Sequence, residues 1–380
     1  TDLGTLNAFW DERSFTPDLL RDADGNYATG RGVAVSNQGL VTVGGWNTIV
    51  DGALIRRSMV WQAGARGVEL SPLPDAVPSS GSYTFVGDVS GDGAVAVGVA
   101  FDDRVTRQPV IWDTATAAVE KLELLPGRRG GQANRISTDG RTIVGSQFGG
   151  PQGVDPIVIW SDGVPQSAGA VIPSGYDRFE ILGITPDGST VTGQLIPIGF
   201  DPFDNPIRPA TWDAMSGFKI LSTLGGGLRL IDDAVLDSSS NGRLMVGTVG
   251  AFVGGGPYAA AVWFEDGSVR SLQEWLTNDF GLLDPGDWRG LLEATSVSDD
   301  GTVIVGYGIN FFGIKEGFVV TLPPADCAMD FDGDGSLTLF DFLEFQNLFD
   351  VRDPIADIDD DGRFTLFDFL TFQTLFDAGC

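Results

Sequence analysis

The sequence has no histidine among its 380 residues, and histidine is the commonest general base and zinc ligand in proteins. Ser-His and Cys-His catalytic pairs are therefore excluded, and any hydrolytic chemistry would have to use carboxylates. The acidic residues outside the repeated turns described below are scattered and form no placed acid and base. We predict that the protein is not an enzyme and has no catalytic residues.

Long apolar runs are also missing, because none approaches the ~20 residues that a helix needs to cross a bilayer. We therefore expect no transmembrane segment. Thr1-Asp2 resembles the mature end left when a signal peptide is removed. We expect an exported bacterial protein, either extracellular or at the cell surface.

Basic residues are scarce, with 23 Lys and Arg against 52 Asp and Glu and a net charge of −29. This balance argues against nucleic acid and anionic membranes as partners and favours cations. The charge is uneven, since residues 326–380 hold 13 Asp and one Glu against two Arg. Length and this charge contrast predict two units, with a chemically distinct tail.

The larger part of the chain is a repeat. A nine-residue frame, Ser/Thr-x-x-Gly-x-x-x-x-Gly, occurs six times, starting at Ser36, Ser90, Ser137, Thr185, Ser239 and Ser298. Most copies place Asp or Asn before the first glycine, a pair that tolerates the positive φ of tight hairpins. Val and Ile follow in most copies, so each frame predicts a β-hairpin whose Asp is structural.

A second marker follows each frame, an apolar stretch that ends in tryptophan in five copies and has phenylalanine in the sixth: Trp61, Trp112, Trp160, Trp212, Trp263 and Phe318. A fourth short apolar piece often comes next. Four strands per unit of roughly 50 residues are typical of a propeller blade. We predict a mainly β protein, a six-bladed β-propeller with the tryptophans packed between blades and an amino-terminal strand completing the last blade. Seven blades are the alternative.

This pattern resembles the extracellular HAF-type repeats over residues 1–322, and its nearest match to the naming letters is Asn7-Ala8-Phe9-Trp10. The resemblance implies a propeller fold and an exported location. Pro323, Pro324 and Ala325 then predict a linker over 323–325.

The tail carries two twelve-residue segments, 330–341 and 357–368, with Asp at positions 1, 3, 5 and 12 and glycine at position 6. Calcium prefers such oxygen ligands, and position 7 contributes a backbone carbonyl. The sequence therefore predicts two Ca²⁺ ions. One is held by Asp330, Asp332, Asp334, Ser336 and Asp341, and the other by Asp357, Asp359, Asp361, Arg363 and Asp368.

Each acidic loop precedes a helix, and this small α-helical duplication resembles a type I dockerin of the GC type over residues 326–380. The loops depart from a standard EF-hand, which has Glu at position 12. The resemblance implies docking to a cohesin-like protein or another cell-surface component. The predicted partner-binding residues are Leu339, Phe340, Leu343, Asn347, Leu366, Phe367, Leu370 and Thr374.

Leu339-Phe340 and Leu366-Phe367 occupy the positions where dockerins read their partner, in place of the familiar hydroxylated pair. The alternative is that these side chains pack the core of the small unit or dock it on the propeller. A third hypothesis is head-to-tail assembly with a neighbouring copy of the chain.

Only two cysteines occur, Cys327 and Cys380, and they bracket the acidic loops. Export favours their pairing in a disulfide, although Cys380 could instead serve as a covalent anchor.

We thus expect a secreted, non-enzymatic protein that docks or anchors through its tail in a scaffold, adhesin or fibre. The rival hypothesis is a dockerin-bearing carbohydrate-active enzyme with a propeller catalytic domain. A glycan is a further candidate partner of the propeller.

Overall fold

The computed structural model describes residues 29–50, 53–63, 67–76, 84–149, 153–200, 205–224, 233–240, 242–250, 259–281, 288–322, 329, 331, 338–358 and 362–378. The chain divides into two compact units, Thr1–Val320 and Thr321–Cys380. The predicted amino-terminal strand and the linker at 323–325 lie outside the described residues.

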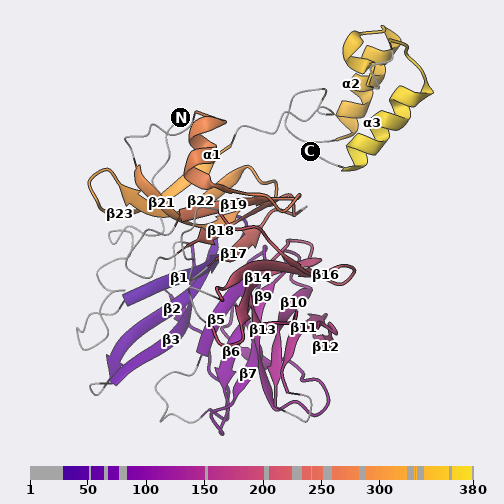
Figure 1. The fold of residues 1–380 in the computed structure, drawn as a ribbon. Coiled ribbons are helices and arrows are strands. Elements are labelled where there is room, and N and C mark those ends of the chain that lie inside the picture. Colours follow the sequence, from indigo (N-terminus) through magenta and orange to yellow (C-terminus); the bar gives the residue numbers. More distant parts are fainter. Residues whose placement is uncertain are drawn as a thin grey trace. The chain divides into compact units, whose positions relative to one another are not determined.

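Six antiparallel sheets make up the first unit, each with its strands paired in chain order, and they define a six-bladed β-propeller (Figure 1). Blade 1 contains β1 (Thr29–Val35), β2 (Val41–Val50), β3 (Ala53–Gln62) and β4 (Val68–Glu69). Blade 2 contains β5 (Thr84–Val89), β6 (Val95–Phe101), β7 (Arg107–Asp113) and β8 (Val119–Lys121). Blade 3 contains β9 (Gly130–Ile136), β10 (Thr142–Phe148), β11 (Asp155–Ser161) and β12 (Val164–Ser167).

The second half of the propeller repeats this plan. Blade 4 contains β13 (Tyr176–Ile184), β14 (Thr190–Pro197), β15 (Arg208–Asp213) and β16 (Gly217–Ile220). Blade 5 contains β17 (Ala234–Ser238), β18 (Leu244–Val249), β19 (Ala259–Phe264) and β20 (Val269–Ser271). Blade 6 has three strands among the described residues, namely β21 (Trp288–Val297), β22 (Val303–Asn310) and β23 (Lys315–Thr321). The prediction of six blades is confirmed.

Each nine-residue frame forms the turn from the first to the second strand of its blade. The first glycine has positive φ in every copy, for example +76° at Gly93 and at Gly140. The hydroxyl that opens the frame accepts the amide five residues later, as Ser90 Oγ does from Val95 at 3.0 Å. Where Asp precedes the glycine, it accepts from that hydroxyl, as Asp92 does from Ser90 at 2.7 Å. The turn aspartates are therefore structural, as predicted.

Glycine is required at the last position of the frame for a different reason. The first strand of every blade carries a β-bulge, at Val33, Gly87, Asn134, Leu182, Leu236 and Thr295. The bulge presses a first-strand carbonyl onto the facing residue of the second strand. A Cβ at Gly98 would overlap the Phe85 carbonyl oxygen, and a Cβ at Gly145 would overlap that of Gln132. Only glycine leaves room for this approach.

The turns of neighbouring blades are hydrogen-bonded to one another through the residue after the opening hydroxyl. The Asn37 amide donates to Gly91 O, the Gly91 amide to Thr138 O, and the Thr138 amide to Pro186 O, at 2.9, 2.9 and 3.0 Å. Pro186 ends this run, because proline has no N–H. The Ser240 amide bonds Asp299 O at 2.9 Å in the same way. The frames therefore join blades as well as strands.

The hydrophobic core lies between blades, and the third-strand tryptophans are part of it. Trp112, Trp160 and Trp263 are fully buried. Their Nε1 atoms each donate at 2.8 Å to a carbonyl in the segment that follows the fourth strand of the preceding blade, those of Ser71, Glu123 and Ser222. Phe318 takes this place in blade 6 and packs edge-on against Trp288. Trp112, Trp160 and Trp263 thus pack between blades, as predicted.

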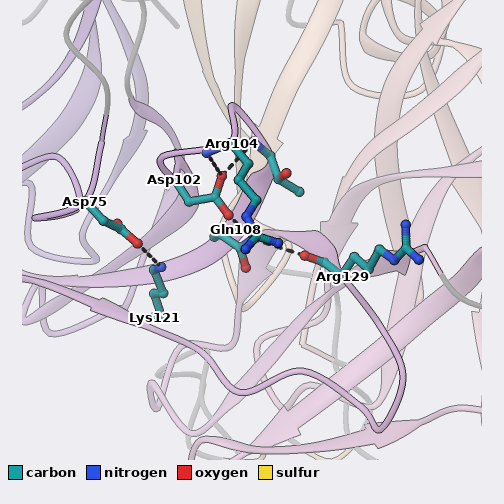
Figure 2. A network of polar contacts seen from close by, with 7 residues as sticks. Asp75, Asp102, Arg104, Gln108, Lys121 and Arg129 are labelled. Carbon is teal, nitrogen blue, oxygen red and sulfur yellow. Dashed lines mark hydrogen bonds and ion pairs between the residues drawn. The ribbon is translucent and has the colours of Figure 1, made fainter.

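Polar contacts also join the blades at two of these interfaces (Figure 2). Lys121 of blade 2 binds Asp75, which follows blade 1, at 2.9 Å. Asp102 accepts the amides of Arg104 and Thr106 and the Gln108 amide group, and Gln108 also donates to the Arg129 carbonyl ahead of blade 3. These contacts brace a loop and link blades.

Two aspartates lie on first strands directly after the bulge, Asp88 in blade 2 and Asp237 in blade 5. Each reaches the next blade: Asp88 accepts the Ile136 amide, and Asp237 accepts the Val297 amide and the Ser296 hydroxyl. Burial raises the pKa of Asp88, against the opposing charge of Arg135. Burial raises the pKa of Asp237 to about 6, hydrogen bonds from Ser296, Val297 and Ser238 oppose this, and the charge of Asp88 adds to it.

A helix that the sequence analysis did not foresee follows β20. The fourth strand of this blade ends at Ser271, whose hydroxyl caps α1 (Leu272–Asn278). Leu272, Trp275 and Leu276 are buried, and Trp275 packs against Phe264 at 5.4 Å between ring centroids. The polar Ser271 is the signal for this helix start.

We predict that Trp112→Phe lowers the free energy of unfolding by about 1–3 kcal/mol, because the Ser71 carbonyl loses its donor inside the blade interface. Urea unfolding of the full chain measures the loss. Trp275→Phe is the matched control, since in the described part of the chain its Nε1 makes no hydrogen bond to another blade. Equal losses in both variants would contradict the proposed role.

A second prediction concerns the effect of Asp237 on how stability depends on pH. Between about pH 4 and pH 6 the native state holds a proton at Asp237 that the unfolded chain releases, so the free energy of unfolding should fall as pH rises through this window. The raised pKa corresponds to about 1–3 kcal/mol. Asp237→Asn should flatten this part of the pH profile, measured by urea unfolding. Asp266→Asn is the control, because hydrogen bonds from Ser268 lower the pKa of Asp266 out of the window.

Candidate functional site

The carboxyl-terminal unit is built on two helices with nearly the same sequence, α2 (Leu339–Asp350) and α3 (Leu366–Ala378), with a short 3₁₀ helix, η3 (Pro354–Ala356), between them. Its core is aromatic. Phe345 and Phe372 stack with ring centroids 4.4 Å apart and an interplanar angle of 10°. Both are buried, so equivalent positions of the two repeats meet at the centre of the unit.

The second acidic loop ends in a carboxylate that lies inside the unit. Asp368 is fully buried and accepts the amides of Ile358 at 3.0 Å and Thr365 at 2.7 Å. Asp357 accepts the Gly362 amide at 2.8 Å, and Gly362 has φ +74°. These bonds join position 1 of the loop to the glycine at position 6, and position 12 to position 2. Such a loop fits a hard cation with oxygen ligands.

The first loop is described at Phe331 and from Thr338 to its end. Asp341 is fully buried, and its carboxylate accepts the Thr338 amide at 2.6 Å. Arg363 is described and exposed, and it has position 7 of the second loop. The other predicted ligands lie outside the described residues: Asp330, Asp332, Asp334, Ser336, Asp359 and Asp361. The two calcium ions remain a prediction.

The carboxylates at position 12 have a second role that the sequence analysis missed. Thr338 and Thr365 precede the helices, and their hydroxyls accept the amides of Phe340 and Phe367 at 3.1 Å. Asp341 bonds the Thr338 amide in return, which completes a capping box at α2, and Asp368 accepts the Thr365 amide in the same way before α3. The spacing Thr-x-x-Asp was the available signal. This box uses Asp, and not Glu, at position 12 of the loop.

The predicted partner-binding residues lie on the surface of the unit. Leu339, Phe340 and Leu343 are 69, 66 and 44% exposed, and Leu366, Phe367 and Leu370 are 70, 66 and 49% exposed. Asn347 and Thr374 are exposed as well. The two repeats therefore present matching apolar sets, and these side chains do not form the core. Whether they bind a partner stays a prediction.

An apolar groove runs between the two sets, with a volume of about 630 Å³. It is lined by Leu339, Phe342, Leu366, Phe369, Leu370, Phe372, Gln373 and Phe376. Its walls come from both helices, so it forms only when the two repeats pack together. Water-facing apolar surface of this kind is typical of a binding groove.

Comparison with known proteins adds little to this geometry. No family model matches the sequence, and no curated protein matches it. Among solved structures, TolB from Acinetobacter baumannii has a TM-score of 0.42 at 13% identity, with 66% of this chain and 57% of that chain covered. The Pyrococcus horikoshii acylaminoacyl peptidase has a TM-score of 0.44 at 12% identity, with 78% and 46% covered.

A third neighbour is the β-propeller domain of the Trilobed protease from Pyrococcus furiosus, with a TM-score of 0.38 at 11% identity and with 78% and 96% of the two chains covered. The present chain thus spans about half the length of TolB and of the peptidase. At such low sequence identities, the activities of these proteins are not assigned to this chain. The class of this protein, a six-bladed propeller followed by a small helical unit, rests on its own strand pairing.

No helix in the described ranges is long and apolar enough to cross a membrane.

Cys327 and Cys380 lie outside the described residues, so their disulfide stays a prediction with its own test. Mass spectrometry of the unreduced protein should show Cys327 joined to Cys380. Their double replacement by serine should lower the stability of the helical unit by up to about 4 kcal/mol, as the entropy of a closed loop of this length suggests. A free or modified Cys380 would instead make the tail a covalent anchor.

Proposed function

We propose that this is an exported, non-enzymatic, calcium-binding propeller protein that docks or anchors through its carboxyl-terminal unit in an extracellular scaffold, adhesin or fibre. The dockerin-like loops hold calcium, and the exposed apolar pairs contact a cohesin-like protein, another surface component or a second copy of the chain. The observation that carries the proposal is the duplication of one arrangement, a buried loop-end carboxylate followed by an exposed Leu-Phe pair.

The support for calcium is the chemistry and closure of the loops. Asp341 and Asp368 are withdrawn from water, and a buried carboxylate is costly unless cations or hydrogen bonds stabilise it. The Asp357 bond to the Gly362 amide closes the second loop. Bound calcium would neutralise the clustered carboxylates of both loops. We infer that the ions stabilise the fold of the helical unit.

The support for docking is the position of the Leu-Phe pairs. They begin α2 and α3, immediately after the threonine caps, so the capping boxes fix their backbone. Closing each loop with calcium would therefore order the residues that we expect to meet a partner. Removing calcium should then weaken docking as well as the fold.

The test uses the full chain. Calorimetry should show uptake of two calcium ions, and Asp359→Asn, a loop position apart from the capping box, should remove one of them. Asp350→Asn, an exposed aspartate outside the loops, is the matched control. No uptake, or uptake unchanged by Asp359→Asn, would contradict the proposed sites.

Docking is read in the same series, as retention of the chain on immobilised cohesin domains and on an immobilised copy of itself. Retention should require calcium and should fall in the double variant Phe340→Ala and Phe367→Ala, while Phe312→Ala, an exposed phenylalanine of the propeller, leaves it unchanged. If retention is unchanged by chelator and unchanged in the double variant, docking through this surface is excluded.

A further inference from the structure

Blade 4 has a cavity of about 610 Å³ where β13 begins and β14 ends, at the opposite end of that hairpin from its Ser/Thr-x-x-Gly turn. This volume lies within the roughly 300–1,000 Å³ that small-molecule sites occupy. The lining residues are Asp177, Arg178, Glu180, Gln194, Ile196, Pro197, Ile198, Gly199, Phe200 and Ile207. They divide into a polar wall and an apolar wall.

The polar wall is held in place by a network centred on Glu180. Arg178 binds one carboxylate oxygen of Glu180 at 3.1 Å, and the Gln194 amide group donates to the other at 2.8 Å. Glu180 and Gln194 face each other across β13 and β14. The side chains of Arg178 and Glu180 remain 58 and 39% exposed, so both still offer hydrogen-bonding atoms to a ligand.

The apolar wall has a buried floor and an exposed rim. Ile196 and Ile207 are 8 and 7% exposed, whereas Ile198 and Phe200 are 62 and 42% exposed. The rim is braced, because the Ile198 amide donates to Gly175 O at 2.9 Å and the Asn205 side chain donates to Ile198 O at 2.8 Å. An aromatic ring and an isoleucine are thus presented to solvent beside the polar network.

The charges of the polar wall limit the ligand. Asp177 and Glu180 repel anions, and the net charge of −29 adds to that repulsion. Arg178 lies 3.9 Å from the Asp177 carboxylate and 3.1 Å from that of Glu180, so it offsets the attraction of both for a cation. Donors and acceptors together fit hydroxyl groups, which both donate and accept. A ligand that also carries an apolar face can cover Phe200 and Ile198.

We propose that this cavity binds a neutral saccharide, with its hydroxyl groups on Asp177, Arg178 and Glu180 and the C–H face of one sugar ring against Phe200. No other site described above is involved, so the inference is independent of the calcium and docking functions of the helical unit. The propeller would then be the ligand-binding part of the protein.

The experiment titrates the full chain with neutral hexasaccharides of glucose, xylose and mannose, followed by calorimetry and saturation-transfer NMR. At least one should bind, and Arg178→Ala and Phe200→Ala should each weaken its binding by roughly tenfold or more. Phe311→Ala is the matched control, an exposed phenylalanine on blade 6, and should leave binding unchanged. Unchanged thermal unfolding of the variants shows that they are folded.

Three outcomes would overturn the proposal. The first is that no neutral saccharide binds at millimolar concentration. The second is binding that Arg178→Ala and Phe200→Ala leave intact, which would place the sugar elsewhere. The third is preference for an oligogalacturonate or a lysine-rich peptide over every neutral sugar, which would contradict the charge argument. Each leaves calcium uptake by the helical unit untouched, so the two functions fail separately.

Discussion

The propeller depends on the close approach of the first two strands in each blade. A bulge in the first strand presses its carbonyl onto the second, and only the second glycine of the frame can accept this contact. In blades 2 and 5 the residue after the bulge is an aspartate that reaches the next blade. Asp88 accepts the Ile136 amide there, and Asp237 accepts the Val297 amide. One local irregularity therefore sets both the strand register and the joints between blades.

The pKa values of aspartates in the propeller are shifted in opposite directions because the surroundings of the carboxylates differ. Hydrogen bonds from the Ser90 hydroxyl and the Ala94 amide lower the pKa of the exposed turn residue Asp92, so its bonds stabilise the fold down to acidic pH. Burial raises the pKa of Asp88 and Asp237, which lie three blades apart in a ring of six. Asp88 and Asp92 are close in the sequence, yet desolvation dominates the pKa shift of Asp88 and hydrogen bonds dominate that of Asp92.

In the helical unit, the carboxylate that ends each acidic loop has two structural roles. Asp341 and Asp368 cap a helix while ending an acidic loop, so loop closure and helix start are coupled through one side chain. The stacked Phe345 and Phe372 then bring the two repeats together and leave their Leu-Phe pairs outside. The four buried core residues are related by the repeat, Met329 to Ala356 and Phe345 to Phe372.

The sequence by itself determined the features that depend on local spacing: six hairpins, the blade plan, the tryptophans between blades and the two acidic loops ahead of matching helices. It could also have revealed the Thr-x-x-Asp caps and the Ser271 start of α1, whose signals are local too. Tertiary structure alone decided that Asp88 and Asp237 are partly buried and reach the next blade, which apolar residues of α2 and α3 stay exposed, and that Arg178, Glu180 and Phe200 line one cavity. Those properties depend on which residues far apart in the chain become neighbours, and a one-dimensional pattern carries no measure of that distance.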